Sequence, residues 1–484
     1  MEAAAIVLAA GAGTRMKSKK PKVVHELLGK PLVRWAVDAA RGAGVGRIVT
    51  VVGHGRELVE PLVADTQVVV QAEQRGTADA VAACAEALAG FDGSLVVISG
   101  DSPLITSDTI ARLVAARERA GAAVVVLTMR LDDPFGYGRI VRGVDGAVER
   151  IVEQKDATPD EAAICECNSG FYCFDARTLF DALTRVGSDN AQGEFYLTDV
   201  LGICRDAGRT VLALACDDAS ECWGVNSRAQ LAEAGRRLQR RINDAHMAAG
   251  VTMWDPDQVW IGPDVRIEPD VELLPQTFLL GSTSVGADSV VGPNTRLTDT
   301  VVGRGCRVDE TVAVEARIDD GATCGPRAYL RPEAHLCEGA KAGTHVEIKK
   351  STIGRNSKVP HLSYIGDTVM GEDVNIGAGS ITCNYDGVNK NRTVIGDGVF
   401  VGSDTMMVAP VTIGAGAMTG AASCIARDVA PGALALERAD QRELAGWVAP
   451  HMEKLRARKA AAEAAAAADG GAAADGQSGG DGES

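Results

Sequence analysis

The sequence predicts an α/β domain with a mostly parallel sheet, followed by a solenoid built from six-residue repeats. In the first half of the chain, Val-rich runs alternate with helical stretches, which is the pattern of an α/β domain. In the second half, aliphatic residues recur at every sixth position. A period of six fits neither a helix nor a single strand, and it describes short strands that stack coil upon coil.

Four aliphatic runs predict strands in the first half, because each is bounded by turn residues and separated from the next by helical spacing of Ala, Leu, Glu and Arg. The runs are IVTVVG (48–53), QVVVQA (67–72), SLVVISGD (94–101) and AAVVVLTM (122–129). Ligands of such sheets bind at the carboxyl ends of the strands. We therefore expect a site where the segments QAEQRGTADA and SGDSPL meet the loop that follows the first strand.

A single amphipathic helix is expected between the two units, with Leu231, Leu238, Ile242 and Ala245 on one face. The repeat begins after it. Its positions are Ile261, Ile267, Leu273, Leu279, Val285, Val291 and Leu297, and it returns at Ile395, Val401, Met407, Ile413 and Ile425. A β-sandwich with coincidental spacing is the alternative, but strands of period two rarely give seven consecutive matches.

Composition excludes several classes of function. The 484 residues carry a formal net charge of −16, which argues against a nucleic-acid or anionic-membrane surface but leaves room for a local group of cations that holds phosphorylated ligands. The 12 cysteines form no C-x-x-C pair, so a reducing compartment is the simpler interpretation. Neither a signal peptide nor a membrane span is indicated. We expect a cytoplasmic protein without a membrane partner.

The stretch IVLAAGAGTRMKSKKPKVVHELLGKPL, which begins at Ile6, joins a strand to a glycine-containing loop and a crowd of cations. It is neither a Walker loop nor a dinucleotide fingerprint. Gly11 and Gly13 would let the backbone approach a phosphate closely. Taken alone, the loop could equally be an ordinary strand-to-helix turn.

Several motifs together carry a family resemblance. LAAGAGTRM, QAEQRGTADA, GDSPL, GYGRIV, VEQKDAT, NAQGEFYLTD and GVNSR occur in the order typical of bacterial N-acetylglucosamine-1-phosphate uridyltransferases. With EIKKSTIG, SKVPHLSYIGD and GAGSITCNYDGVNK in the repeats, the chain resembles the bifunctional uridyltransferase/glucosamine-1-phosphate acetyltransferase family up to about Val448.

The resemblance implies a domain plan and an assembly. A Rossmann-like nucleotidyltransferase domain would span 1–226, a linker helix 227–250, and a left-handed parallel β-helix with a C-terminal extension 251–448. The family forms homotrimers whose acetyltransferase sites lie between subunits. The remaining segment, 449–484, is Ala- and Gly-rich, and we expect a frayed helix from about Ala457 that passes into a disordered tail.

The resemblance also implies two reactions. Acetyl-CoA would acetylate glucosamine-1-phosphate, and UTP with Mg²⁺ would then uridylate N-acetylglucosamine-1-phosphate and release pyrophosphate, which supplies peptidoglycan and lipopolysaccharide-type precursors. Two alternatives stay open. One is a sugar-1-phosphate nucleotidyltransferase with a regulatory β-helix, and the other is a non-catalytic assembly subunit with the same pair of domains.

For uridyl transfer, the resemblance assigns Arg15 and Lys22 to the triphosphate and to the charge that develops in the reaction. Asp101 and Asn226 would hold Mg²⁺, although an Asp that ends a strand is often only a helix cap. The nucleotide would be contacted by Leu8, Ala9, Ala10, Gly11, Lys22, Gln71, Gly76 and Thr77. The sugar phosphate would be contacted by Gly138, Glu153, Asn168 and Asn226.

For acetyl transfer, the attacking amine must be neutral, so a base with a pKa near neutrality is needed, and His361 is the candidate. A histidine among solenoid strands is by itself more often a packed or surface residue. By resemblance, Arg331, Lys349, Tyr364, Asn375 and Lys390 would hold the sugar phosphate, and Asn384, Tyr385, Ser403, Ala421 and Arg438 would contact acetyl-CoA. Glu437 is a departure, because a carboxylate beside Arg438 could weaken the binding of coenzyme A.

Overall fold

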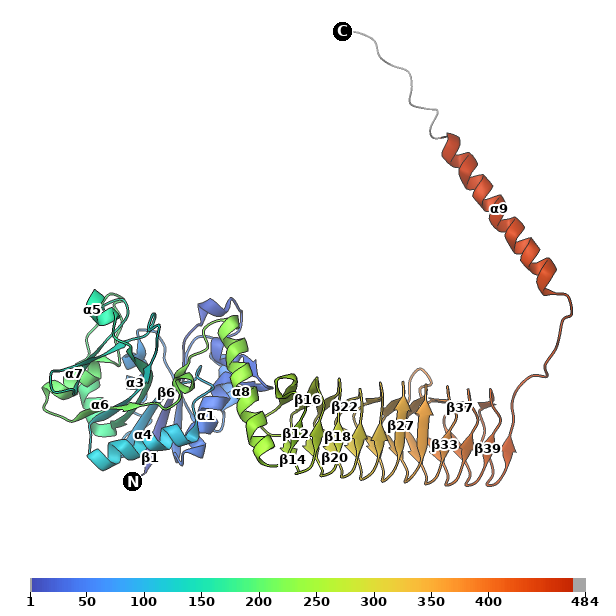
Figure 1. Ribbon diagram of the computed structural model, residues 1–484, viewed down its shortest axis with the longest axis horizontal. Coiled ribbons are helices and arrows are strands. Elements are labelled where there is room, and N and C mark those ends of the chain that lie inside the picture. Colours follow the sequence, from blue (N-terminus) through green and yellow to red (C-terminus); the bar gives the residue numbers. More distant parts are fainter. Residues whose placement is uncertain (1, 473–484) are drawn as a thin grey trace, which may run out of the picture.

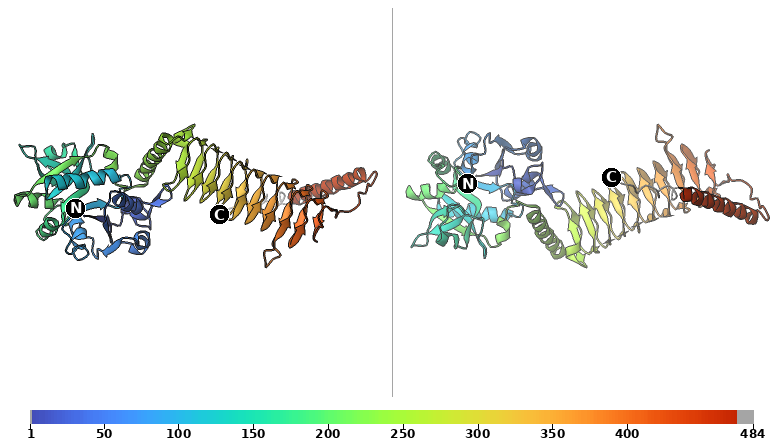
Figure 2. Two further views of the ribbon diagram at one scale, coloured as in Figure 1. Left: turned by 90° about the horizontal axis from the view of Figure 1, so that it is seen from below. Right: turned by 90° about the horizontal axis from the view of Figure 1, so that it is seen from above.

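The computed structural model describes residues 2–472 and the side chains of residues 2–466. An α/β domain lies at one end of an elongated molecule and a row of stacked coils forms the rest, with helix α8 (Arg228–Ala248) between them (Figure 1). Two further views show the same order along the long axis (Figure 2). Within residues 2–472, no helix combines the length and the apolar character that crossing a bilayer requires.

The N-terminal domain is built on one nine-stranded sheet with the order β11-β7-β10-β6-β1-β4-β5 and the hairpin β8-β9 attached to β10. The strands β6, β1, β4 and β5 run parallel, whereas β10 is antiparallel to both of its neighbours. The strands are β1 (Ala3–Ala9), β4 (Arg47–Val52), β5 (Gln67–Val70), β6 (Ser94–Ser99), β7 (Val124–Arg130), β8 (Arg139–Arg142), β9 (Val148–Val152), β10 (Glu166–Asp175) and β11 (Val211–Ala215). The four strands predicted from aliphatic runs are confirmed as β4, β5, β6 and β7.

Helices cover both faces of this sheet, because side chains of successive strand residues point to opposite faces. Ala4 and Ile6 belong to one hydrophobic core, whereas Ala5 and Val7 belong to the other. The helices are α1 (Leu32–Gly42), α2 (Arg56–Val59), α3 (Thr77–Ala82), α4 (Ser107–Ala120), α5 (Pro159–Ala162), α6 (Ala176–Leu183) and α7 (Asp199–Asp206). The short 3₁₀ helices are η1 (Thr14–Met16), η2 (Lys22–Val24), η3 (Glu60–Val63) and η4 (Ala219–Cys222), and a small hairpin is formed by β2 (Glu26–Leu27) and β3 (Lys30–Pro31).

Helix α8 joins the two units through buried polar side chains as well as apolar ones. Gln239 and Asn243 are 3% and 0% exposed, and their amides donate to the carbonyl of Val259 at 2.7 and 2.8 Å. Leu238 is buried as expected, but Ala245 is exposed, so the predicted stripe is wrong at that position. The buried face of α8 includes Asn243 because the side-chain amide of Asn243 donates to backbone carbonyls of the first coil.

The solenoid is a left-handed parallel β-helix of three sheets, each built from every third strand. The first sheet contains β12 (Thr252–Met253), β15 (Glu272–Leu273), β18 (Val290–Val291), β21 (Arg307–Val308), β24 (Thr323–Cys324), β27 (Lys341–Thr344), β30 (Lys358–His361), β33 (Asn375–Ile376), β36 (Phe400–Val401), β39 (Met418–Thr419) and β41 (Leu434–Ala435). The second contains β13 (Val259–Ile261), β16 (Thr277–Leu280), β19 (Arg296–Thr298), β22 (Val312–Val314), β25 (Tyr329–Leu330), β28 (Glu347–Lys349), β31 (Tyr364–Gly366), β34 (Ile381–Cys383), β37 (Met406–Val408) and β40 (Cys424–Ile425). The third contains β14 (Arg266–Ile267), β17 (Ser284–Val285), β20 (Val301–Val302), β23 (Arg317–Ile318), β26 (Ala334–Leu336), β29 (Ser351–Ile353), β32 (Thr368–Met370), β35 (Thr393–Ile395) and β38 (Val411–Ile413), and η5 (Pro256–Gln258) precedes β13.

The six-residue period is confirmed as one inward aliphatic side chain per strand. Leu279 and Leu297 are paired in neighbouring coils and are both 0% exposed. The period slips where a coil is shorter, since Val285 pairs with Val302 rather than with a residue eighteen positions on. It is interrupted most strongly after β34, where residues 384–392 form an inserted loop closed by a bridge between Tyr385 and Lys390.

The C-terminal segment is helical over part of the expected tail. Helix α9 spans Val448–Ala472 and projects away from the solenoid in Figure 1, so it begins before Ala457, where a frayed helix was expected to start. Its run of Ala and charged residues favours helix formation without burial. The last residues of the expected tail, 473–484, lie outside the described part of the chain.

We predict that Ile348→Ala destabilises the solenoid by about 2–5 kcal/mol, because it leaves a cavity in a close-packed column. Ile348 is 0% exposed and pairs with Leu330 below and Ile365 above. Urea unfolding of the full chain, followed by its β-sheet circular dichroism, measures the change. Val301→Ala is the control, because this side chain is 47% exposed and its loss should cost less than about 0.5 kcal/mol. Equal transition midpoints for the two variants would contradict the packing argument.

Candidate active sites

A cleft of about 310 Å³ opens at the carboxyl ends of β1, β5 and β6. Its position agrees with the expectation for ligand sites of parallel sheets. The cleft is lined by all nine of the predicted residues Leu8, Ala9, Ala10, Gly11, Lys22, Gln71, Gly76, Thr77 and Asp101. Five residues that were not predicted also line it: Val23, Gln74, Ala80, Ser99 and Glu194.

Lys22, Asp101 and Asn226 meet at the edge of this cleft, although they come from η2, the end of β6 and the segment before α8. The Lys22 ammonium donates to the Asp101 carboxylate and also to the Asn226 side-chain oxygen at 2.8 Å. Lys22 and Asp101 are only 15% and 14% exposed. Two side-chain oxygen atoms therefore converge on the Lys22 ammonium at the cleft edge, and oxygen atoms of this kind are also the ligands that a hard metal ion prefers.

The two glycines of the opening loop have different reasons to be glycine. Gly11 lines the cleft, and a Cβ there would meet nothing within 4 Å. Gly13 has φ of 64°, and a Cβ there would lie 2.5 Å from Cβ of Lys22. Gly13 thus packs against the backbone that carries Lys22, rather than only making room for a ligand.

One wall of the cleft is held by a network around Gln71, which is 5% exposed. Its amide donates to Asp79 at 2.8 Å and to the carbonyl of Gly76 at 3.2 Å. Gly76 has φ of 126°, and a Cβ there would lie 2.4 Å from the carbonyl oxygen of Phe195. The hydroxyl oxygen of Thr77 accepts from the backbone N–H of Leu197 at 3.0 Å, so segment 195–198 supports this wall.

Segment 195–198 also contacts the predicted sugar-binding group of Gly138, Glu153 and Asn168, through Thr198. Asn168 donates its backbone N–H to the carbonyl of Gly138 at 2.8 Å, and the Glu153 carboxylate would lie 3.4 Å from a Cβ on Gly138. Burial raises the pKa of Glu153, which the hydroxyl of Thr198 offsets only in part. A ligand hydroxyl that donates a hydrogen bond to Glu153 would therefore stabilise its charged carboxylate, in place of the water that burial excludes.

Arg15 is placed differently from the other predicted residues of this site. It lies on η1, is exposed, and is not among the residues that line the cleft. Its role therefore remains a prediction, whereas Lys22 already occupies the cleft.

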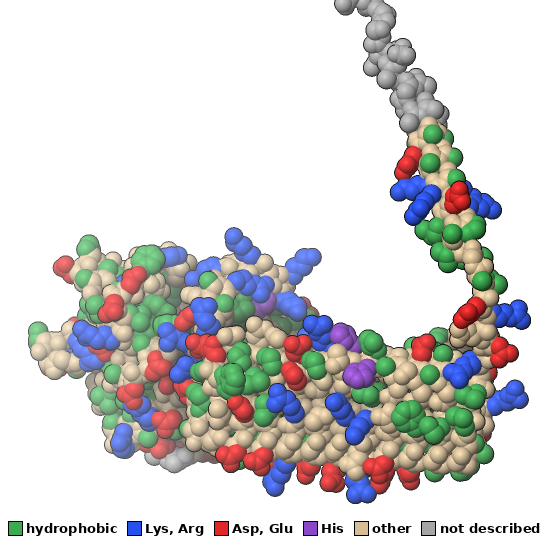
Figure 3. Space-filling view, turned by 45° about the vertical axis from the view of Figure 1, so that its right-hand side comes forward, with side chains coloured by type: hydrophobic (Ala, Val, Ile, Leu, Met, Phe, Trp, Pro, Cys, Tyr) green, Lys and Arg blue, Asp and Glu red, His purple; other side chains and the backbone are tan. Residues whose placement is uncertain are grey.

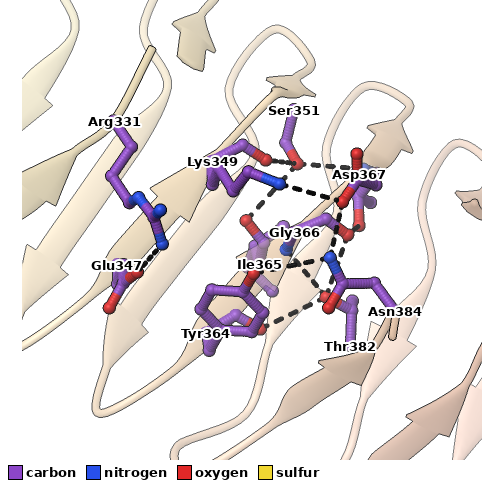
Figure 4. A network of polar contacts seen from close by, with 11 residues as sticks. Arg331, Glu347, Lys349, Ser351, Tyr364, Ile365, Gly366, Asp367, Thr382 and Asn384 are labelled. Carbon is purple, nitrogen blue, oxygen red and sulfur yellow. Dashed lines mark hydrogen bonds and ion pairs between the residues drawn. The ribbon is translucent and has the colours of Figure 1, made fainter. Parts of the chain in front are cut away.

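A second cluster of predicted residues crosses four successive coils of the solenoid, at strands β25, β28, β31 and β34 (Figure 4). The Asp367 carboxylate accepts from the Asn384 amide at 2.5 Å and lies 3.4 Å from the Lys349 ammonium. The Asn384 amide also lies 3.4 Å from the hydroxyl of Tyr364. Arg331 pairs with Glu347 at 2.8 Å. Asp367 and Glu347 orient these cations and were not predicted.

A hollow of about 370 Å³ adjoins this cluster and includes Asp367, Lys390 and Arg392 among its lining residues. The Lys349 cation lies close to Lys390 and lowers the pKa of the Lys390 ammonium. Two neighbouring cations repel each other unless an anion lies between them. The hollow is therefore suited to a phosphate.

A different group of predicted residues follows one corner of the solenoid. The predicted residues His361, Ser403 and Ala421, together with Ala378, which was not predicted, hold equivalent positions in successive coils. The hydrogen bonds from Gly379 N to His361 O, Asp404 N to Ala378 O and Ala422 N to Ser403 O indicate this register. The Arg438 guanidinium donates to the carbonyl of Ala421 at 3.3 Å and extends the row. Successive coils are spaced by about 4.8 Å, so this corner forms a long edge.

The two groups are not joined within the chain. Among the described residues, no hydrogen bond links the exposed side chain of His361 to Lys349, Tyr364 or Asn384. Asn375 lies on β33 in the same sheet as His361, and Tyr385 lies on the inserted loop, 61% exposed.

The departure at Glu437 is partly accounted for. Its carboxylate accepts from the backbone N–H of Cys424 at 3.2 Å. The carboxylate is therefore held by the wall of the solenoid beside the row that Arg438 extends.

Comparison with known proteins gives matches along nearly the whole chain. Residues 5–198 match the model of the MobA-like NTP transferase domain. The bifunctional protein GlmU of Corynebacterium efficiens is 51% identical over 471 residues, which cover 96% of both chains. The proteins of the same name from Streptomyces coelicolor and Trichlorobacter lovleyi are 50% identical over 469 residues and 47% identical over 448 residues. They cover 96% and 92% of this chain, and 96% and 97% of their own lengths.

One solved structure, a UDP-glucose pyrophosphorylase complexed with UDP-glucose, aligns with 50% of this chain and 100% of its own. Its TM-score of 0.40 and its identity of 19% are too low to support an inference.

We predict that Gly13→Ala destabilises the N-terminal domain by more than about 1 kcal/mol, since an added Cβ is strained at positive φ and collides with Lys22. Thermal unfolding monitored by circular dichroism measures the effect. Gly11→Ala is the matched control, because its Cβ enters open space in the cleft and should leave the unfolding temperature unchanged. If both variants unfold at the temperature of the parent protein, the packing role of Gly13 is wrong.

Proposed function

The chain belongs to the bifunctional GlmU family, and we propose which of its residues carry out the family's two reactions. This membership confirms the resemblance drawn from the sequence motifs. The chain is a bifunctional transferase that makes UDP-N-acetylglucosamine by acetyl transfer and uridyl transfer, and this product is used in cell-wall synthesis. Neither a single-activity nucleotidyltransferase nor a non-catalytic subunit is favoured by relatives that share this name over nearly their whole length.

Uridyl transfer is assigned to the cleft of the N-terminal domain, taken as residues 1–226. The sugar-phosphate oxygen of N-acetylglucosamine-1-phosphate attacks the α-phosphorus of UTP, and the bond to pyrophosphate breaks. Charge repulsion between the two phosphates is the main obstacle. The Lys22 ammonium offsets it at the cleft edge, and the backbone around Gly11 lets the triphosphate approach. Arg15 would join from η1 when the triphosphate is bound.

The convergence of Lys22, Asp101 and Asn226 carries this assignment. Asp101 and Asn226 both present hard oxygen atoms to the Lys22 ammonium, and such oxygen atoms would suit Mg²⁺ better than a softer ion. When bound, Mg²⁺ would neutralise phosphate charge and keep the phosphates in line for transfer. Gln71, Gly76 and Thr77 would contact the uracil, and Gly138, Glu153 and Asn168 the sugar.

Acetyl transfer is assigned to the β-helix, taken as residues 251–448. His361 removes a proton as the 2-amino nitrogen of glucosamine-1-phosphate attacks the thioester carbon of acetyl-CoA, and the thiolate of coenzyme A leaves. The row of His361, Ser403, Ala421 and Arg438 offers a long corner for an extended cofactor. Arg331, Lys349, Tyr364, Asn375 and Lys390 would hold the sugar phosphate, while Asn384 and Tyr385 orient the reacting groups.

A homotrimer would unite the two groups of acetyltransferase residues. Within one chain, His361 lies at one corner of the solenoid and the Lys349 cluster at the next. Large apolar side chains are exposed on the coils, among them Phe278 at 39%, Tyr329 at 42% and Phe400 at 46%. Hydrophobic patches appear on the solenoid surface in Figure 3. Such patches favour association with another copy. A cytoplasmic location remains part of this proposal.

Because the two reactions are assigned to different domains, we predict that two substitutions each impair one reaction and leave the other intact. Asp101→Asn should reduce uridyl transfer at least about a hundredfold, because it removes one charge from the metal position. His361→Ala should reduce acetyl transfer by roughly 10²–10⁴-fold, because it removes the base. Mass spectrometry of the sugar products from glucosamine-1-phosphate, acetyl-CoA, UTP and Mg²⁺ measures both.

The Asp101→Asn reaction should stop at N-acetylglucosamine-1-phosphate, and added N-acetylglucosamine-1-phosphate should rescue His361→Ala. His345→Ala is the matched control, because His345 is another histidine of the solenoid, one coil from His361, and it is not among the residues assigned to the site. If the wild-type protein never acetylates the amine, the assignment of the β-helix to acetyl transfer fails.

The trimer predicts that dilution separates the two activities. Acetyl transfer per chain should fall as the trimer dissociates, because its site needs two subunits, whereas uridyl transfer per chain should stay constant. Sedimentation velocity at the assay concentrations reports the state of association. Undiminished acetyl transfer by a preparation that sediments as a monomer would rule out a shared site.

A further inference from the structure

We propose that Asp319, His335 and Cys337 form a binding site for a borderline divalent cation of the Zn²⁺ class. The site lies on the third sheet of the solenoid, away from the residues assigned to either reaction. It stands on the geometry of two neighbouring coils and on the chemistry of the three donors.

The β-helix itself brings the three side chains together. Arg317 pairs with His335, and Ile318 pairs with Leu336, in the parallel strands β23 and β26. Ile318 and Leu336 are both 0% exposed and point into the core. Residues one position away therefore point outward, which places Asp319 beside Cys337 and next to His335. The backbone holds all three positions before any ion arrives.

The donor atoms are spaced for a small ion. The Nε2 atom of His335 lies 2.7 Å from Oδ2 of Asp319 and 3.9 Å from Sγ of Cys337. All three donors lie within 4.8 Å of one another. Tetrahedral Zn²⁺ takes N, O and S ligands at roughly 2.0–2.3 Å, which separates the donors by about 3.3–3.6 Å. Small side-chain rotations are enough to reach these distances.

The position of Asp319 and Cys337 in the coil is unusual within this chain. In the adjoining coils, the equivalent residues are glycines, Gly286 and Gly303 on one side and Gly354 and Gly371 on the other. A Cβ on Gly354 would lie 2.0 Å from the carbonyl oxygen of Gly371, and one on Gly286 would lie 2.7 Å from the carbonyl carbon of Gly303. The corner thus excludes side chains in most coils, yet two consecutive coils carry metal-binding ones.

Neighbouring charges leave the donors available. Arg317 donates its Nε–H to Oδ1 of Asp319 at 2.7 Å, so Oδ2 remains turned toward His335. This contact orients the carboxylate, as outer hydrogen bonds do around metal ligands. The side chains of His335 and Asp319 are 33% and 26% exposed, so an ion can enter from solvent.

Binding requires a defined movement of protons. The neutral His335 ring must carry its proton on Nδ1, so that the Nε2 lone pair meets the ion, and the Cys337 thiol must release one proton to solvent. The ion then bonds to one nitrogen, one thiolate sulfur and one carboxylate oxygen, and water completes the tetrahedron. A thiolate and an imidazole favour Zn²⁺ or Co²⁺ over Mg²⁺.

Cobalt titration tests the site. The probe is Co²⁺ added to the full chain without an affinity tag, after chelator treatment and in excess Mg²⁺. Bonding to Cys337 should give a near-ultraviolet thiolate-to-cobalt band that saturates at one Co²⁺ per chain and is removed by Zn²⁺. Cys337→Ser should abolish the band, and His335→Gln should weaken Co²⁺ binding at least about tenfold.

Cys424→Ser is the control, because Cys424 is an exposed cysteine of the same solenoid and should keep the band unchanged. Circular dichroism spectra that match the parent protein establish that each variant is folded. A band that persists in Cys337→Ser, or the absence of a saturable band in the parent protein, would overturn the proposal.

Discussion

The ion pair between Lys22 and Asp101, with Asn226 bonded to the same ammonium, is the interaction on which the N-terminal site depends. It connects the loop after β1, the end of β6 and the start of α8. Gly13 is needed beneath it, because any side chain there would displace Lys22. Since α8 continues into the cap of the first coil through Gln239 and Asn243, the chemistry of the cleft and the junction between the domains share one helix.

The β-helix imposes a different constraint, which is that equivalent residues of successive coils stack. One corner aligns His361, Ser403 and Ala421, and the next carries the cluster around Asp367. The proposed acetyltransferase residues of one chain therefore lie in stacked rows along the corners of the solenoid, and they do not line a single enclosed pocket. The inserted loop that carries Tyr385 and Lys390 is the main departure from that regularity, and it lies next to the hollow suited to phosphate.

The strands and coils could be predicted because the patterns that indicate them are local. The Val-rich runs and the six-residue period can each be recognised in a short stretch of sequence. The burial of Gln239 and Asn243 could not be predicted, because it depends on carbonyls of the first coil. Lys22, Asp101 and Asn226 were predicted from family motifs. Their mutual contact could not be predicted from the motifs, because it depends on how the fold brings three distant segments together. The supporting carboxylates Glu347 and Asp367 had no motif of their own, and the spacing of Asp319, His335 and Cys337 acquires meaning only from the register of β23 and β26.

The most direct test of the central claim is calorimetric titration of UTP, with and without Mg²⁺, into the wild-type protein and Asp101→Asn. If Asp101 and Asn226 hold the metal beside Lys22, Mg²⁺ should tighten UTP binding to the wild-type protein and have little effect on the variant. An equal response to Mg²⁺ in both proteins would show that the metal is held elsewhere, and the account of the cleft would be wrong.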